Sequence, residues 1–216
     1  MLKLHGVALS NYYNVVKHTM LEKGIPFEEV TVPPSQDPDF LVKSPMGKVP
    51  CLETPDGFLS EALAIIEYLE ETHPVPKLFP AGAYERAKTR EIIKYAELYL
   101  DAPARRLLGH VLLGAPLSQD AHAEVRPAIE RGLAALKRVA RYEPWVAGKE
   151  FSYADIVLLH MLGLTQLITQ SVYQWSPLDD EPKLAAWMAK ASARAHSQSV
   201  RADQQQALTA MQAKRS

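Results

Sequence analysis

The sequence predicts an α+β domain followed by an all-α helical domain. Strand and helix signals alternate over residues 1–76, whereas every signal over residues 84–216 is helical. Between them, prolines interrupt one helical pattern at residues 72–76, and residues 80–82 lead into the next, which indicates a short linker. A chain of 216 residues is long enough for two domains.

The charge changes sign at the same boundary. Residues 1–76 contain 5 Lys, no Arg and 11 acidic residues, a net charge of −6. Residues 77–216 contain 19 Lys plus Arg and 14 acidic residues, a net charge of +5. The whole chain has a net charge of −1, so its total charge favours neither a nucleic acid nor a membrane surface as a partner.

The elements of the first domain follow from its apolar patterns and turn residues. They are a strand at residues 1–6, a helix from Ser10 to Lys23 closed by Gly24, an alternating strand at 27–32, a short helix at 37–43, a hairpin of 49–54 and 58–60 around Asp56-Gly57, and a helix opened by Ser60-Glu61-Ala62. The order βαβ and then αββα predicts an α+β sandwich of thioredoxin type.

The second domain is predicted as a series of helices. They are a helix from Tyr84 to about Leu113 kinked by Pro103, a helix from Ser118 to about Tyr142 containing Pro127, a helix opened by Ser152 and Asp155 as a capping box, and a last long helix with Pro182 in its first turn. The polar stretch from Gln204 to Ser216 is expected to fray.

The compartment is predicted to be the cytoplasm. The chain has one cysteine, Cys51, which excludes an internal disulfide framework and is expected to be an inert core residue. Residues 1–6 lack the apolar core of a signal peptide. The most apolar run, residues 156–164, is too short to span a bilayer, so no membrane partner is expected.

A candidate ligand site is indicated where the hairpin and its following helix begin. Pro50 opens an apolar strand although it cannot donate a ladder hydrogen bond. We expect a cis Val49–Pro50 bond, which turns the N–H and C=O of Val49 toward a ligand. The helix start at Glu61 and Ala62 favours a carboxylate. Together these features suit a small acidic peptide such as glutathione.

The chain resembles the cytosolic glutathione S-transferase superfamily along nearly its whole length, and within it a bacterial subclass that uses serine. The resemblance rests on Ser10 to Lys17, on residues 21–28, on Pro45-Met46-Gly47-Lys48-Val49-Pro50, on Glu61 and Ile65, and on residues 147–155. It implies the glutathione transferase fold, glutathione as co-substrate without a metal, and a homodimer. It also implies that residues 1–76 bind glutathione and residues 84–216 carry the second-substrate pocket.

The chemistry implied is ionisation of the glutathione thiol. A free thiol has a pKa of about 8.5, and a hydroxyl hydrogen bond plus a helix N-terminus lowers it. Ser10 is the first candidate for the hydroxyl, although a plain N-cap role is its alternative. Asn11 is the second candidate donor. The family's usual Glu-Ser is Glu61-Ala62 here, so one hydroxyl for the γ-glutamyl carboxylate is missing.

The remaining site residues are each expected to bind one part of glutathione. We expect Lys48 to bind the glycyl carboxylate and the main chain of Val49 before Pro50 to pair with the cysteinyl peptide. We expect Glu61 to bind the γ-glutamyl ammonium and the N–H of Ala62 to bind the γ-glutamyl carboxylate. Tyr12, Tyr13, Arg106 and His110 are candidates for the second-substrate pocket. Packing or solvated roles are the alternatives for all four.

The predicted function is glutathione transfer to a small electrophile, a detoxification reaction. Two alternatives stay open from the residues. The first is a glutathione-dependent disulfide reductase, since the polar Asn11, Tyr12 and Asn14 near the sulfur suit a second glutathione. The second is a binding module with this fold and little turnover, which Ala62 favours.

Overall fold

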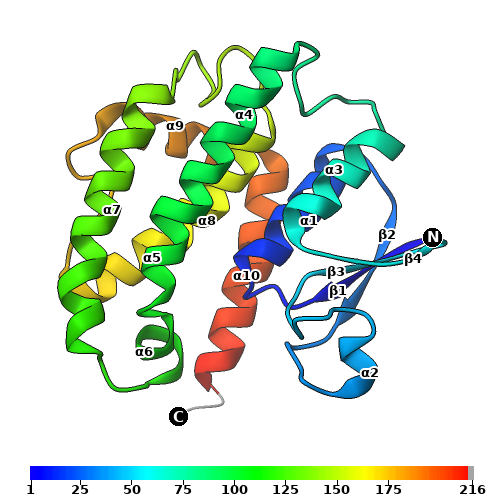
Figure 1. Ribbon diagram of the computed structural model, residues 1–216, viewed down its shortest axis with the longest axis horizontal. Coiled ribbons are helices and arrows are strands. Elements are labelled where there is room, and N and C mark those ends of the chain that lie inside the picture. The colour runs from blue at the N-terminus through cyan, green and yellow to red at the C-terminus, as the bar shows by residue number, and fades with distance from the viewer. Residues whose placement is uncertain (214–216) are drawn as a thin grey trace. The chain divides into compact units, whose positions relative to one another are not determined.

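The structure, a computed structural model, describes residues 1–213. The chain divides into two compact units, which are coloured along the sequence in Figure 1. The first unit contains Met1–Lys77 together with residues 193–213, and the second contains Leu78–Ser192. The first unit is the thioredoxin-like α+β domain predicted from the sequence, and the second is all-helical.

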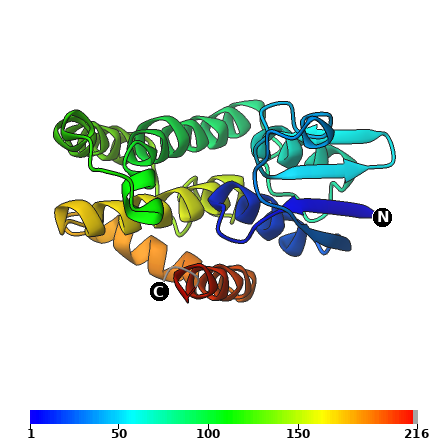
Figure 2. The same ribbon diagram turned by 90° about the horizontal axis from the view of Figure 1, so that it is seen from below.

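The first unit is built on one four-stranded sheet. Its elements are β1 (Leu2–Gly6), α1 (Asn11–Glu22), β2 (Phe27–Thr31), α2 (Pro38–Leu41), β3 (Cys51–Thr54), β4 (Gly57–Ser60), α3 (Ala62–Thr72) and α10 (Ala195–Ala213). The strand order is β2-β1-β3-β4, with β1 and β2 parallel and the other pairs antiparallel. Figure 2 shows this order, with the cyan β3–β4 hairpin at one edge and β2 beyond β1.

The helices of this unit cover the sheet from both sides. Figure 1 shows α1 and α3 on one side of the sheet and α2 on the other. The buried face of α1 presents Val15, Val16 and Met20, and that of α3 presents Ile65, Ile66 and Leu69, all with at most 1% exposure. These two helices pack against each other, so the apolar spacing seen in the sequence forms one core.

The C-terminal helix α10 belongs to the first unit by its contacts. It packs on α1, where Arg194 pairs with Glu22 at 2.6 Å and Asp203 pairs with Lys17 at 2.8 Å. The predicted second domain, 84–216, differs here from the structure, and its residues 214–216 lie outside the described part. The predicted single last helix is also wrong, since α9 (Pro182–Ser192) ends before α10 begins, and α10 stays helical where fraying was expected.

The ion pair between Glu22 and Arg194 is predicted to make the stability of the first unit depend on pH. The Glu22 side chain is 8% exposed and contacts His18 as well as Arg194. Burial raises the pKa of this carboxyl, but the hydrogen bonds from His18 and Arg194 outweigh burial and lower it from 4.5 to about 2. Because the pKa of Glu22 is lower in the folded than in the unfolded protein, its ionised carboxylate stabilises the fold. This stabilisation is complete at a pH above the unfolded pKa and is lost as the pH falls through the folded pKa.

We therefore expect Glu22→Gln to lower the free energy of unfolding at pH 7 by about 1–3 kcal/mol. The difference from the wild type should shrink as the pH falls from about 4.5 toward 2. Urea titrations at pH 7, 4 and 3 measure it. A difference that stays constant over this range would contradict the proposed linkage.

The second unit consists of α4 (Ala83–Tyr95), the π-helical segment η1 (Ala96–Asp101), α5 (Ala102–Arg105), α6 (Leu108–Leu113), α7 (Gln119–Val139), α8 (Tyr153–Tyr173) and α9. The helix predicted from Tyr84 to about Leu113, with a kink at Pro103, is divided into α4, η1, α5 and α6. Because Pro103 has no N–H, the regular hydrogen bond to the preceding turn is lost, and the wider π-helical turn lies directly before it. The second break falls at Arg106 and Leu107, ahead of α6.

Helix α8 forms the core of the second unit. It packs against α4, η1, α5, α6 and α9 within this unit. By length and composition α8 would also fit a membrane span, but 56% of its apolar window is buried inside the protein. That burial is typical of a core helix. The predicted capping box at its start is confirmed. The Ser152 side chain accepts a hydrogen bond from the backbone N–H of Asp155, and the Asp155 carboxylate accepts one from the N–H of Ser152 at 2.9 Å.

Candidate active site

The strand register of the first unit brings three predicted site segments to one end of the sheet. Cys51 in β3 pairs with His5 in β1 on one side and with Ser60 in β4 on the other. Both pairings are antiparallel, so the residue before Cys51, Pro50, lies level with Gly6 and Glu61. The chain then continues from Gly6 to Ser10, so the starts of α1 and α3 meet at this end of the sheet beside residues 48–50.

Ser10 is the N-cap residue of α1. Its backbone is extended, with φ −80° and ψ 118°, and its Oγ accepts the N–H of Tyr13 at 3.3 Å. The N-cap interpretation is thus confirmed, and it is compatible with catalysis. A hydroxyl oxygen that accepts one hydrogen bond still carries a hydrogen that it can donate, here at the positive end of α1.

Asn11, the second candidate donor, is enclosed. Its side chain is 1% exposed, and its Oδ1 accepts the N–H of Tyr12 at 3.1 Å. Ser10 is half-buried and therefore more accessible than Asn11. Of the two candidate donors, the Ser10 hydroxyl is therefore the one that a ligand can reach more easily.

A tight turn presents Lys48 and Val49. The N–H of Gly47 donates to the carbonyl of Ser44 at 2.7 Å, and the carbonyl of Lys48 accepts from the Ser44 hydroxyl at 2.8 Å. Gly47 has φ +64°, and a Cβ there would lie 2.2 Å from the carbonyl oxygen of Ser35, so only glycine fits. Lys48 is exposed, and the predicted cis Val49–Pro50 bond is confirmed.

Glu61 has an unusual backbone at the start of α3. It is the N-cap residue with φ 68° and ψ 109°, and its exposed side chain makes no capping hydrogen bond. A non-glycine residue at positive φ costs about 1–3 kcal/mol, and such residues cluster at binding sites. Ala62, the first residue of α3, is 4% exposed. A helix N-terminus favours an anion, so binding of a carboxylate at Ala62 stays a prediction.

Cys51 is the inert core residue that the sequence predicts. Its side chain is fully buried, and its Sγ donates to the carbonyl of Lys43 at 3.1 Å. Burial raises the pKa of the thiol to about 11. Because the thiolate is the reactive form, the protein's own sulfur is not a nucleophile at neutral pH.

Tyr13 does not line an open pocket, which corrects its predicted role. It is 2% exposed, its ring lies against Gly6, and its hydroxyl donates to Glu29 at 2.5 Å. Burial, reinforced by this hydrogen bond, raises the pKa of the Tyr13 hydroxyl. The packing alternative is therefore correct for Tyr13.

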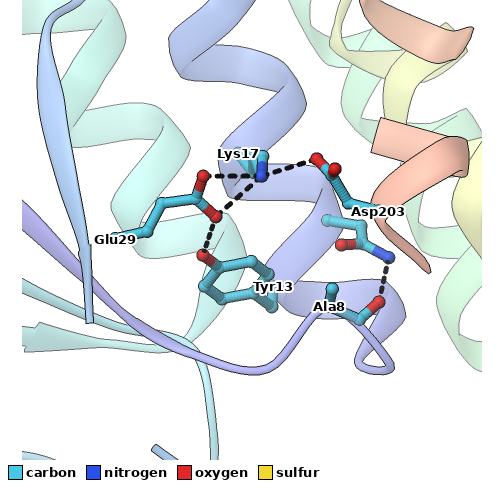
Figure 3. A network of polar contacts seen from close by, with 6 residues as sticks. Ala8, Tyr13, Lys17, Glu29 and Asp203 are labelled. Carbon is cyan, nitrogen blue, oxygen red and sulfur yellow. Dashed lines mark hydrogen bonds and ion pairs between the residues drawn. The ribbon is translucent and has the colours of Figure 1, made fainter. Parts of the chain in front are cut away.

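Figure 3 shows the polar network to which Tyr13 belongs. Lys17 of α1 lies between Glu29 of β2, with both carboxylate oxygens at 2.7 Å, and Asp203 of α10 at 2.8 Å. Burial lowers the pKa of Lys17, but the hydrogen bonds to Asp203 and Glu29 outweigh burial and raise it. The network holds the sheet, α1 and α10 together.

The contacts of Tyr12, Arg106 and His110 neither support nor exclude a place in the second-substrate pocket, so that role stays a prediction. Tyr12 is half-buried in the first turn of α1. Arg106 is exposed and pairs with Glu124 at 2.7 Å, and the Nδ1 of exposed His110 lies 2.8 Å from the carbonyl oxygen of Ala115. Both contacts stay within the second unit.

Sequence reasoning missed the role of Asn14. Its side-chain amide donates to the carbonyl of Ala8 at 2.9 Å, in the loop that leads to Ser10. It also missed the pairing of Lys17 with Glu29 and Asp203, since Asp203 lies 186 residues away in sequence. The one local signal was a lysine on the apolar side of a helix.

Comparisons with known proteins agree with this architecture. The family model of the glutathione S-transferase N-terminal domain matches residues 4–77, and that of the glutathione S-transferase C-terminal domain matches residues 119–190. The chain is 40% identical over 210 residues to a glutathione S-transferase of Pseudomonas putida, covering 97% of this chain and 96% of that one. The chain belongs to the glutathione S-transferase family.

Solved structures show the same fold. The crystal structure of a glutathione S-transferase from Rhodospirillum rubrum superposes with a TM-score of 0.77 at 26% identity, covering 93% of this chain and 91% of that one. The structure of human glutathione transferase theta-2 in complex with glutathione superposes with a TM-score of 0.83 at 23% identity, covering 100% and 92%. The second likeness concerns the fold alone.

Proposed function

We propose that this protein is a glutathione transferase of the serine type, in which Ser10 donates a hydrogen bond to the glutathione thiolate. The observation that carries the proposal is the common position of Ser10, Val49 and Glu61 at one end of the sheet. Two helix N-termini face this end, and both favour an anion.

In this proposal each segment holds one part of glutathione. Lys48 binds the glycyl carboxylate, and the main chain of Val49 before Pro50 pairs with the cysteinyl peptide as in strand addition. Glu61 binds the γ-glutamyl ammonium, and the N–H of Ala62 binds the γ-glutamyl carboxylate. The sulfur then lies at the start of α1, where the Ser10 hydroxyl and the helix dipole stabilise its anion. The thiolate attacks a small electrophile.

Ser10→Ala tests this role. Loss of a hydrogen bond to an anion costs about 1.5–3 kcal/mol, so turnover should fall roughly ten- to a hundred-fold. The pKa of the bound thiol should rise, with little change in glutathione affinity. The pH dependence of turnover with a model electrophile, together with calorimetric titration of glutathione, measures both effects.

Ser118→Ala is the matched control, because Ser118 caps α7 through the same contact, an Oγ that accepts an N–H at 3.3 Å. It should lose comparable cap stability, about 1 kcal/mol, with unchanged turnover. If Asn11→Ala rather than Ser10→Ala abolishes thiol ionisation, the donor is Asn11 and the serine assignment is wrong.

Disulfide reduction is the second candidate reaction. Bound glutathione thiolate attacks a disulfide, and a second glutathione resolves the mixed disulfide, so no protein cysteine is needed. The buried Cys51 thiol with its raised pKa favours this route over one through a protein thiol. Retention on immobilised glutathione, followed by parallel assays with an aromatic halide and a mixed disulfide, separates transfer, reduction and a non-catalytic binding module.

We further propose a cytoplasmic homodimer in which the acidic residues 1–76 of one chain face the basic residues 77–216 of the other. Sedimentation should give about twice 24.0 kDa. Raised salt should weaken the dimer only slightly if apolar contacts dominate its interface. A monomer at every protein concentration would refute this assembly.

A further inference from the structure

We infer that Asn14 is a positioning residue that holds the Ser10 hydroxyl in place. The inference rests on the proposed function of Ser10. Asn14 lies in the second turn of α1 and is fully buried. Its side-chain amide reaches back to the loop between β1 and α1 and donates to the carbonyl of Ala8 at 2.9 Å, the contact drawn to Ala8 in Figure 3.

Main-chain contacts connect this hydrogen bond to Ser10. The N–H of Ser10 donates to the carbonyl of Val7 at 2.9 Å, which closes the loop into a turn. The N–H of Asn14 donates to the carbonyl of Ser10 at 3.0 Å. Asn14 therefore binds the loop on both sides of Leu9: its main chain binds Ser10, and its side chain binds Ala8. The side-chain bond is the part that a substitution can remove.

The second observation is that the amide oxygen of the Asn14 side chain accepts no hydrogen bond within residues 1–213. This atom, Oδ1, is buried. The assignment of the two amide atoms is set by chemistry, since the atom facing the Ala8 carbonyl has to be the donor nitrogen. A buried acceptor without a partner costs stability. The buried Oγ1 of Thr19, further along α1, also has no partner among the described residues, so the bond donated to Ala8 is what distinguishes Asn14 from it.

The consequence for catalysis follows from the short reach of a serine side chain. The Ser10 Oγ position is set by its backbone and by the Tyr13 N–H. Release of Ala8 frees the loop that precedes Ser10, and the hydroxyl then spends less time directed at the sulfur. The groups proposed to hold the rest of glutathione, Lys48 and Glu61, lie on other segments and are not affected. Loss of Asn14 should change thiol ionisation and leave glutathione affinity intact.

The experiment measures the pKa of bound glutathione by thiolate absorbance, together with kcat and KM, in Asn14→Ala and Asn14→Leu. We expect kcat to fall roughly ten-fold and the pKa of the bound thiol to rise by about 1, while KM for glutathione stays within about two-fold. Asn14→Leu keeps a side chain of similar branching that carries neither a donor nor a charge, so it reports the loss of the N–H donor if the alanine variant folds poorly. Thr19→Ala, a buried change further along α1, is the control and should leave the thiol pKa unchanged.

A double-mutant cycle with Ser10→Ala separates the two hypotheses. If Asn14 acts through Ser10, Asn14→Ala has no further effect on the thiol pKa once Ser10 is alanine. If Ser10→Ala raises the thiol pKa and neither Asn14 variant does, the inference is wrong and the proposed function stands. If Ser10→Ala leaves the thiol pKa unchanged, the role proposed for Ser10 and the inference both fail. Equal effects of Thr19→Ala and Asn14→Ala would reduce Asn14 to a packing residue.

Discussion

Replacing Asp155 with alanine should lower the free energy of unfolding of the second unit by about 3–5 kcal/mol. The Asp155 carboxylate is fully buried and accepts four hydrogen bonds. The donors are the N–H of Val146 at 2.9 Å, the N–H and hydroxyl of Ser152 at 2.9 and 3.1 Å, and the indole N–H of Trp187 at 2.7 Å. Alanine leaves three buried N–H groups without their acceptor, and each such group costs about 1–3 kcal/mol.

The chain offers a direct reporter and a matched control for this prediction. All three tryptophans, Trp145, Trp175 and Trp187, belong to the second unit, so their fluorescence in a urea titration follows its unfolding. Asp179→Ala is the control: the exposed Asp179 accepts one N–H, from Ser176 at 3.0 Å, and its loss should cost about 1 kcal/mol or less. Equal losses in the two variants would show that the buried carboxylate does not organise the start of α8.

The Asp155 site illustrates which parts of the fold the sequence predicts. The spacing of Ser152 and Asp155 is a local signal for a helix start, and the structure confirms it. The same holds for Asp56-Gly57 in the hairpin and for Gly24, which ends α1 with φ +63°. The bond from Trp187 to Asp155 spans 32 residues and has no counterpart in any local pattern. Local chemistry is therefore predictable where a partner lies within a few residues.

The errors occur where distant partners decide the structure. The stretch from Gln204 onward reads as a fraying polar tail, yet α10 continues through it to Ala213. Two ion pairs ahead of this stretch hold α10 on α1: Asp203 with Lys17, 186 residues apart, and Arg194, directly before α10, with Glu22, 172 residues apart. The break between α9 and α10 contains neither proline nor glycine, so no turn signal announces it. For Tyr13 the sequence leaves a pocket role and a packing role open, because its hydroxyl partner, Glu29, cannot be predicted from spacing. The common location of Ser10, Val49 and Glu61 at one end of the sheet could be predicted because each follows a turn or strand end, while their binding roles stay predictions.

Replacing Lys23 with methionine should lower the free energy of unfolding by about 3–5 kcal/mol. The Lys23 side chain is fully buried, and its ammonium makes three contacts, one for each N–H. It pairs with Glu70 at 2.7 Å and donates to the carbonyls of His73 at 2.8 Å and Pro76 at 2.7 Å. Methionine keeps the length of the chain but removes the cation from a carboxylate that is only 7% exposed.

A double variant can separate the loss of the Lys23–Glu70 ion pair from a simple loss of packing. Removing both partners of a buried pair is less costly than removing one, so Lys23→Met combined with Glu70→Gln should recover a large part of the loss. Lys137→Met is the control, because Lys137 pairs with Glu181 at 3.0 Å with 64% of the Lys137 side chain and 24% of the Glu181 side chain exposed, and an exposed pair contributes about 0–1 kcal/mol. Urea titrations followed by circular dichroism compare the wild type, the two single variants, the double variant and the control. If the double variant is as unstable as the sum of the two single variants, the energy lies in the contacts to His73 and Pro76 and not in the ion pair with Glu70.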